Sequence, residues 1–276
     1  MNIFQSIVLG IVEGLTEFLP VSSTGHLTLA EGLLGLPVND ESITAFTAVI
    51  QVGAIIAVLL YFRTDIARIV VAFVRGLTDR NARTFDYRLG WYVIAGSLPI
   101  GIIGFLGRDL ITGGLRNLWV VAAGLILWSA VMVFAERQAT QRRAETDTKL
   151  RDALIIGTLQ CVALIPGVSR SGATISTGLL LGLDRVAATR LSFFLAIPAL
   201  TAAGLYELPT ALNGGVGAVP TLVGTVVSFV VAYASIAWLL RFVAKHRISA
   251  FVPYRLAVGV LILALLATGV LSATGS

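Results

Sequence analysis

The sequence predicts an all-α polytopic membrane protein, an inverted repeat with six transmembrane helices and two re-entrant helix hairpins. Three observations predict this class: an apolar composition, six long apolar stretches, and two further apolar stretches that are interrupted midway. Of the 276 residues, 57% are hydrophobic and 13% are charged, and the mean hydropathy is +0.90, whereas a soluble domain carries roughly 25% charged residues. The polar segments are too short for a second domain, so residues 1–276 form a single integral membrane domain.

Six apolar stretches approach the length of about 20 residues that a membrane-spanning helix needs. They are residues 43–62, 89–106, 118–135, 191–208, 220–240 and 254–272. Two further regions, 2–35 and 153–183, are cut by Pro, Gly and Ser, which leaves each half too short to span. Irregular backbone at membrane depth survives only where protein or a water-filled cavity surrounds it. We therefore predict two re-entrant helix–turn–helix hairpins whose breaks meet.

Basic residues predict the orientation of the chain. Lys and Arg concentrate in three connecting segments, residues 63–88, 137–151 and 241–255, the last of which ends at Arg255. The opposite side holds only Arg108 and Arg116. Because cytoplasmic loops carry an excess of Lys and Arg, the three basic segments are predicted to be cytoplasmic and both termini to lie outside. The first hairpin would then enter from outside and the second from the cytoplasm.

An arrangement of this kind is an inverted repeat, and the sequence carries a trace of it. A shift of 147 residues aligns Gly10 with Gly157, Glu13 with Gln160, Val21 with Val168, Ser22 with Ser169, Thr24 with Ser171 and Gly25 with Gly172. The predicted repeats cover about residues 1–136 and 152–273, each with one hairpin and three spans. Broken helices at matching positions of two repeats point to a site near the membrane midplane.

Two carboxylates, Glu13 and Glu17, lie inside the apolar N-terminal region. An ionisable group at membrane depth costs a few kcal/mol or more, so it marks a candidate functional site. At a spacing of four on a helix, both carboxylates share one face about 6 Å apart. Such a pair can share a divalent cation, or one member can act as a base. The alternative is a polar helix face that lines the interior without catalysis.

A cluster of hydroxyls and an imidazole follows these acids. Pro20 ends the first helix, and Ser22, Ser23 or Thr24 can cap the next one, whose N-terminus favours an anion. Simple capping by one hydroxyl is the alternative interpretation. His26 follows Ser23 by three residues, so it can activate a hydroxyl, protonate a leaving group or act as the nucleophile itself.

The second break, residues 166–172, places glycines, hydroxyls and Arg170 at a helix start. The planar guanidinium of arginine suits bidentate phosphate contact, and backbone amides of such a turn can form an anion-binding nest. Cys161 is the single cysteine, which excludes an intrachain disulfide. The basic excess is explained by cytoplasmic loops, and no nucleic-acid-binding motif is present, so no nucleic-acid partner is predicted.

Both motifs resemble the undecaprenyl-pyrophosphate phosphatase family, also called the bacitracin-resistance family. EGLTEFLPVSSTGH at residues 13–26 resembles its first signature and PGVSRSGAT at residues 166–174 its second, with similarity along the whole chain. The resemblance implies removal of the terminal phosphate from a C55 isoprenyl pyrophosphate, which recycles the lipid carrier of cell-wall synthesis. It also implies dependence on a divalent cation, Mg²⁺ or Ca²⁺, and a site reached from the periplasmic side of the bacterial inner membrane.

From the residues and the resemblance together, we predict the members of the site. Glu13 and Glu17 would hold the metal. The expected catalytic residues are Glu13, Glu17, Ser23, His26 and Arg170. The expected substrate-binding residues are Ser22, Thr24, Gly167, Ser169, Arg170, Ser171, Gly172 and Thr174. The expected partners are the polyprenyl pyrophosphate lipid, the membrane, and bacitracin as a competitor for the substrate, with a homodimer as one candidate assembly.

Two other functions fit parts of this pattern. Inverted repeats with broken helices are typical of transporters, so a transporter or flippase for a phosphorylated lipid is the first alternative. A type 2 phosphatidate phosphatase-like enzyme is the second, but that family uses a second histidine, and His246 lies in a basic loop. The nucleophile is left open between Ser23, His26 and water.

Overall fold

The computed structural model describes residues 1–37, 40–107, 109–213 and 216–273 of the chain. These residues form helices and connecting loops, with an isolated β-bridge between Arg143 and Leu183. Six of the described helical segments are long and apolar enough to cross a membrane, which confirms the predicted all-α polytopic membrane protein. They are α3 (Glu41–Tyr61), α5 (Phe85–Leu106), α6 (Leu118–Gln138), α9 (Arg185–Asn213), α10 (Ala218–Val243) and α11 (Val252–Ala267), the last preceded by the 3-10 turn η5 (Ile248–Phe251).

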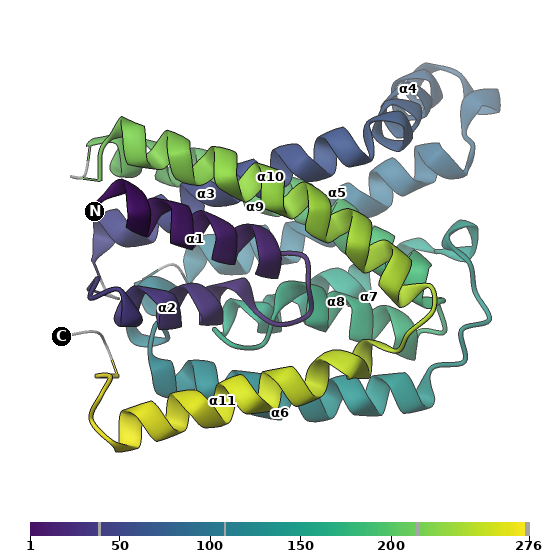
Figure 1. The fold of residues 1–276 in the computed structure, drawn as a ribbon. Helices are drawn as coiled ribbons and strands as arrows, with labels where there is room; N and C mark the ends of the chain where they lie inside the picture. The colour runs from purple at the N-terminus through teal and green to yellow at the C-terminus, as the bar shows by residue number, and fades with distance from the viewer. Residues whose placement is uncertain (38–39, 108, 214–215, 274–276) are drawn as a thin grey trace.

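Both interrupted regions fold into pairs of short helices. In the first, α1 (Ile3–Thr16) runs from the N-terminal end toward the middle of the molecule, and α2 (Ser23–Leu33) returns (Figure 1). In the second, α7 (Leu150–Gln160) and the turn η4 (Cys161–Leu164) lead to the break that precedes α8 (Arg170–Leu180). The two pairs are thus helical hairpins, and their entry from opposite faces of a bilayer stays a prediction.

The two breaks have the same local geometry. Ser22 and Ser169 each precede the returning helix and have positive φ angles of 75° and 80°. Each serine side chain accepts a hydrogen bond from the backbone N–H three residues later, at Gly25 and Gly172. Non-glycine residues with such backbone angles carry about 1–3 kcal/mol of strain and cluster at functional sites. The predicted alignment of residue 22 with residue 169 therefore has a structural counterpart, while the full repeat boundaries stay a prediction.

Close packing around the hairpins relies on small residues. α1 lies against α10, and α6 packs against α11, α2 and α8 (Figure 1). A Cβ at Gly10 would lie 2.6 Å from the Gly224 carbonyl oxygen, and one at Gly157 would lie 2.0 Å from the Gly96 carbonyl oxygen. Such contacts are typical of helix packing in membranes, where small residues let backbones approach. Gly10 and Gly157 are also a pair in the predicted repeat alignment.

The N-terminal residues and the last described residues of the chain lie at the same end of the molecule, as six spans require (Figure 1). At this end the first residue of α6 is tied to the C-terminal segment, since the Leu118 N–H donates to the Ala273 carbonyl at 3.0 Å. The basic segments lie at the opposite end. The chain between the spans includes the short turns η1 (Arg80–Ala82), η2 (Leu110–Gly114) and η3 (Glu145–Asp147).

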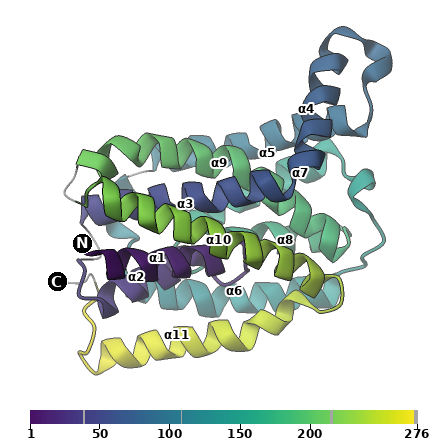
Figure 2. The same cartoon turned by 45° about the horizontal axis from the view of Figure 1, so that its top comes forward.

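The segment 63–88 is not the loop that the sequence analysis expected. It holds α4 (Arg63–Thr78), which with the start of α5 projects beyond the other helices (Figure 2). Apolar side chains recur at helical spacing along α4, and Val70, Val74 and Leu77 are exposed. The charges excluded this segment from the predicted spans, but a helix with one apolar and one charged face forms without crossing the membrane.

Two arginines also depart from the expected loop positions. Arg255, assigned to a basic cytoplasmic loop, lies in the first turn of α11 and is 0% exposed. Arg116, assigned to the opposite loop side, is also buried. Arg108 lies outside the described residues. Burial is tolerated because each of these two guanidiniums has acceptors inside the protein, which are described below.

Candidate active site

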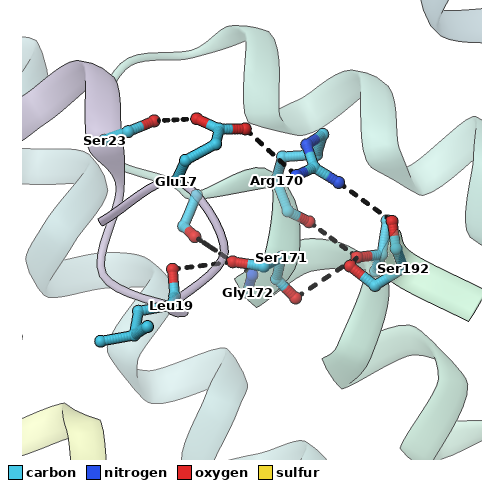
Figure 3. A network of polar contacts seen from close by, with 9 residues as sticks. Glu17, Leu19, Ser23, Arg170, Ser171, Gly172 and Ser192 are labelled. Carbon is cyan, nitrogen blue, oxygen red and sulfur yellow. Dashed lines mark hydrogen bonds and ion pairs between the residues drawn. The ribbon is translucent and has the colours of Figure 1, made fainter. Parts of the chain in front are cut away.

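The two breaks meet inside the bundle, as predicted. The Gly167 N–H donates to the Ser22 hydroxyl oxygen at 3.1 Å. The Ser171 hydroxyl donates to the Leu19 carbonyl at 2.8 Å, so each break contributes to the other (Figure 3). Gly167 has a φ of +93°, and a Cβ there would lie 2.2 Å from the Val121 carbonyl oxygen on α6. This position therefore requires glycine for both its backbone angle and its packing.

The side chain of Arg255 links the two breaks through hydrogen bonds. Its guanidinium donates to the Pro20 carbonyl of the first break at 3.0 Å. It also donates to the Gly167 and Val168 carbonyls of the second break at 2.9 and 3.2 Å. Further bonds reach the Ser129 hydroxyl and the Gly124 and Leu125 carbonyls of α6. Carbonyls freed by an interrupted helix need donors in the interior, and one buried arginine supplies them here.

Glu17 connects the hydroxyl cluster to the second break. One carboxylate oxygen accepts from the Ser23 hydroxyl at 2.5 Å, and the other accepts from Arg170 at 3.1 Å (Figure 3). Glu17 and Ser23 are buried, and the side chain of Arg170 is 9% exposed. A short hydroxyl–carboxylate bond in a buried site polarises the hydroxyl toward its alkoxide, while the guanidinium supplies positive charge beside it. The predicted residues Glu17, Ser23 and Arg170 thus come together.

Arg170 is held on three sides. Besides Glu17, it donates to the Ser192 carbonyl of α9 at 3.0 Å, and its guanidinium lies 5.9 Å from the Phe18 ring centre. Thr174 supports this contact, because its hydroxyl and the Ser192 hydroxyl form a hydrogen bond of 2.7 Å. The Nε of Arg170 is buried and has no hydrogen-bond partner. The guanidinium is therefore fixed in place, and its Nε–H is a donor that no described residue satisfies.

Glu13 lies next to this arrangement and is 0% exposed. Neither of its carboxylate oxygens has a hydrogen-bond partner, and it is within electrostatic range of Glu17 and Arg170. An unpartnered carboxylate in the interior is costly unless a cation or a proton neutralises it. Among the described residues, no group of three or more His, Cys, Asp or Glu side chains gathers around a common point. Mg²⁺ needs only one or two carboxylates beside water and phosphate oxygens, so Glu13 and Glu17 fit such an ion.

His26 takes a position that the sequence analysis did not expect. Its Nδ1 lies 2.8 Å from the Ser22 carbonyl, which can only accept, so Nδ1 carries the proton. Its Nε2 lies 2.8 Å from the Tyr254 hydroxyl, which must then donate, and the two rings stack at 5.5 Å. Both ring nitrogens are occupied, and the Ser23 hydroxyl donates to Glu17 instead. The structure therefore does not pair His26 with Ser23.

A cavity of about 200 Å³ opens beside the two breaks. Six of the predicted residues line it: Glu17, Ser22, Ser23, Thr24, Ser169 and Arg170. The other predicted residues do not line it, namely Glu13, His26, Gly167, Ser171, Gly172 and Thr174. Apolar side chains such as Ile100, Ile111 and Leu200 complete the wall. A volume of roughly seven water molecules suits a phosphate headgroup rather than a whole lipid.

Several residues of this site escaped the sequence analysis. Gln51 of α3 and Arg116 line the cavity, Ser192 holds Arg170, and Tyr254 bonds to His26. Arg255 could have been found, because it follows Pro253 at the start of an apolar span, where a charge needs a partner. Gln51 could also have been found, because it is a polar amide inside the predicted span 43–62. Ser192 and Tyr254 carry no signal of this kind.

The fold and the site define a class: a polytopic membrane protein in which two broken helical hairpins enclose acids, hydroxyls and arginine beside a small cavity. The chain matches the family model described as bacitracin resistance protein BacA over residues 6–261. It therefore belongs to the bacitracin resistance protein BacA family.

Similar proteins support this membership. Over 273 residues the chain is 61% identical to undecaprenyl-diphosphatase 1 of Streptomyces coelicolor, with 98% of both chains covered. It is 57% identical to undecaprenyl-diphosphatase of Acidothermus cellulolyticus, with 99% of this chain and 100% of the relative covered. Undecaprenyl-diphosphatase of Corynebacterium diphtheriae is 51% identical, with 98% and 96% covered.

Proposed function

We propose that the protein is a membrane phosphatase that hydrolyses undecaprenyl pyrophosphate to undecaprenyl phosphate and inorganic phosphate. Membership of the family and the names of relatives at 51–61% identity support this activity over transport. The structural observation that carries it is the bond from Ser23 to Glu17, with Arg170 on the same carboxylate and all three lining one cavity. Transport alone needs no polarised hydroxyl beside a fixed guanidinium.

The geometry favours Ser23 as the nucleophile. Its oxygen bonds to the terminal phosphorus while its proton passes to Glu17, which already accepts it at 2.5 Å. The bond from that phosphorus to the bridging oxygen breaks, and undecaprenyl phosphate leaves with the bridging oxygen. Water then attacks the phosphoserine phosphorus and the bond from phosphorus to the serine oxygen breaks; that oxygen takes back the proton from Glu17, and both protons of the water leave on inorganic phosphate. Arg170 steadies the negative charge that builds on the phosphoryl oxygens.

Glu13 and Glu17 would hold the divalent cation, Mg²⁺ or Ca²⁺. When bound, such an ion screens the charge of the phosphates and orients them. Two observations support this assignment. Both carboxylate oxygens of Glu13 are without a partner, and each carboxylate oxygen of Glu17 has a lone pair beyond the one that accepts its hydrogen bond. Gly172 and Ser171 shape the second break, so their contribution to substrate binding is indirect in this proposal.

The substrate also defines the setting. We place the protein in the bacterial inner membrane with both termini outside, and the cavity open toward that side. Bacitracin would then compete for the lipid pyrophosphate rather than for the protein. Assembly as a homodimer stays a prediction.

The test is phosphate release by the purified protein in detergent, with long-chain prenyl pyrophosphate and divalent cation. Wild type should turn over, whereas Glu17→Gln and Ser23→Ala should lose most of kcat while remaining folded. Arg170→Lys should also lose activity, because a lysine ammonium cannot reproduce the planar set of N–H donors of the guanidinium. Single-turnover quench with labelled substrate identifies the nucleophile. Label on His26, or full activity in Ser23→Ala, would reverse the assignment of Ser23, and a wild type without phosphate release would refute the phosphatase.

A further inference from the structure

A second arginine faces the cavity with the same arrangement as Arg170. Arg116 lies between the turn η2 and α6, is 7% exposed and lines the cavity. Its terminal nitrogen donates to both carboxylate oxygens of Glu31, at 2.8 and 2.9 Å. Its Nε is buried and has no hydrogen-bond partner. Glu31 lies on α2 and is 0% exposed, so the carboxylate of this ion pair is completely buried.

The parallel with Arg170 indicates a ligand. Each guanidinium is fixed through one nitrogen by a buried carboxylate, and each leaves a buried Nε without a partner. Leaving a charged donor unsatisfied in the interior is costly, so such groups normally have a partner in the working state. Among the described residues, Arg116 and Arg170 are the arginines that line this cavity. The wall of one small cavity therefore includes two fixed guanidiniums, and a pyrophosphate has two phosphates.

We propose that Arg116 binds the lipid-attached phosphate of the substrate, while Arg170 binds the terminal phosphate. This assignment rests on the proposed function, because it needs a headgroup with two phosphates. The terminal phosphate must lie beside Ser23 and Arg170, where the attack occurs. The lipid-attached phosphate then takes the remaining part of the cavity, which includes Arg116 and the apolar Ile111 of the same segment. Glu31 positions Arg116 and does not touch the substrate.

Products separate the two phosphates, and this gives a sharp test. Farnesyl phosphate carries only the lipid-attached phosphate, and inorganic phosphate corresponds to the terminal one. Calorimetric titration of the full-length protein in detergent, with divalent cation, measures both without turnover. Arg116→Gln should weaken farnesyl phosphate binding about 10- to 100-fold, as expected for one or two hydrogen bonds to a charged group. It should leave inorganic phosphate binding within about twofold of wild type.

Two further variants distinguish binding from structure. If the ion pair only held α2 in place, the double variant Glu31→Gln/Arg116→Gln, which leaves no unpaired charge, would restore farnesyl phosphate binding. We expect the double variant to bind farnesyl phosphate as weakly as Arg116→Gln does. Arg68→Gln is the matched control, because Arg68 is a salt-bridged arginine that is 57% exposed and lies away from the cavity. It should bind both probes like wild type.

The outcomes also separate this proposal from the proposed function. Unchanged farnesyl phosphate binding in Arg116→Gln, or an equal loss for both probes, would overturn the role of Arg116 while phosphate release by wild type leaves the phosphatase intact. Wild-type protein could instead bind farnesyl phosphate in an Arg116-dependent way but release no phosphate from the pyrophosphate. That result would refute the proposed phosphatase activity and support the phosphate-binding role of Arg116.

Discussion

Replacing Arg255 by methionine should separate the two breaks without touching the cavity wall. Arg255 does not line the cavity, but it donates to carbonyls of both breaks. Methionine has a similar apolar stem and no donors. The substitution therefore removes the donors of Pro20, Gly167 and Val168, whose carbonyls are not in regular helix.

The magnitude follows from the three orphaned carbonyls. Each buried acceptor that loses its partner costs about 1–3 kcal/mol. Their sum is partly offset, because the guanidinium no longer has to be buried without a carboxylate. We expect a net destabilisation of about 3–5 kcal/mol, the lower part of the sum for three acceptors. At roughly 2–4 °C per kcal/mol for a chain of this size, the unfolding midpoint should fall by about 10 °C.

Activity should fall more steeply than substrate binding. A misplacement of about 1 Å in a catalytic arrangement can cost about 100-fold in rate. In Arg255→Met we therefore expect kcat to fall about 100-fold at temperatures where the protein stays folded, with a smaller change in KM. Unfolding is followed by size-exclusion recovery after heating, and kcat by phosphate release. Arg241→Met is the matched control, since Arg241 is exposed at the end of α10.

Arg255→Lys should fall between wild type and Arg255→Met, because one ammonium keeps the charge but cannot reach both breaks and Ser129 together. If Arg255→Met kept the stability and kcat of wild type, the proposed role of Arg255 would be refuted. The carbonyls of the two breaks would then have hydrogen-bond partners without the arginine. A stable variant with low kcat would instead keep the positioning role and reject the stability estimate.

Three further predictions address orientation, packing and the cation. A cysteine at Ala144, in a Cys161→Ser background, should resist an impermeant external thiol reagent in intact cells; labelling would invert the predicted topology. Gly167→Ala should lose both activity and several kcal/mol of stability, since its Cβ would lie 2.2 Å from the Val121 carbonyl oxygen; a soluble, active variant would contradict this. Glu13→Gln should raise the divalent-cation concentration needed for half-maximal turnover by at least tenfold; an unchanged titration curve would remove Glu13 from the metal site.

The spans and breaks were predictable because the membrane fixes their physics. A run of about 20 apolar residues has few alternatives to a spanning helix, and Pro20 or Gly167 inside such a run must interrupt it. The positions of α3, α6 and α10 follow from this argument alone. The helix α4 was missed because an amphipathic helix and a charged loop have similar composition, and only their spacing differs.

The site was predictable in its members but not in its connections. The short sequence separation of Ser23 and His26 suggested a hydroxyl–imidazole pair, yet His26 bonds to Tyr254, which is 228 residues away. Likewise the contacts of Arg255 reach residues 88 and 235 positions away. Such partners depend on how distant helices pack, which no local pattern encodes. Glu17 was expected to bind metal, and the structure adds its bond to the Ser23 hydroxyl.

The charges around the breaks bear on the proposal that a divalent cation accompanies the substrate. Three carboxylates and three guanidiniums line the cavity or contact its walls and the breaks: Glu13, Glu17, Glu31, Arg116, Arg170 and Arg255. Two ion pairs, Glu31 with Arg116 and Glu17 with Arg170, account for four of them. Their formal sum is zero, so a pyrophosphate would bring its negative charge into a buried group that is already balanced. Uncompensated charge in such a site is strongly unfavourable. Under the proposed function, a divalent cation that bound with the headgroup would offset part of this charge, and the unpartnered oxygens of Glu13 would be acceptors for it.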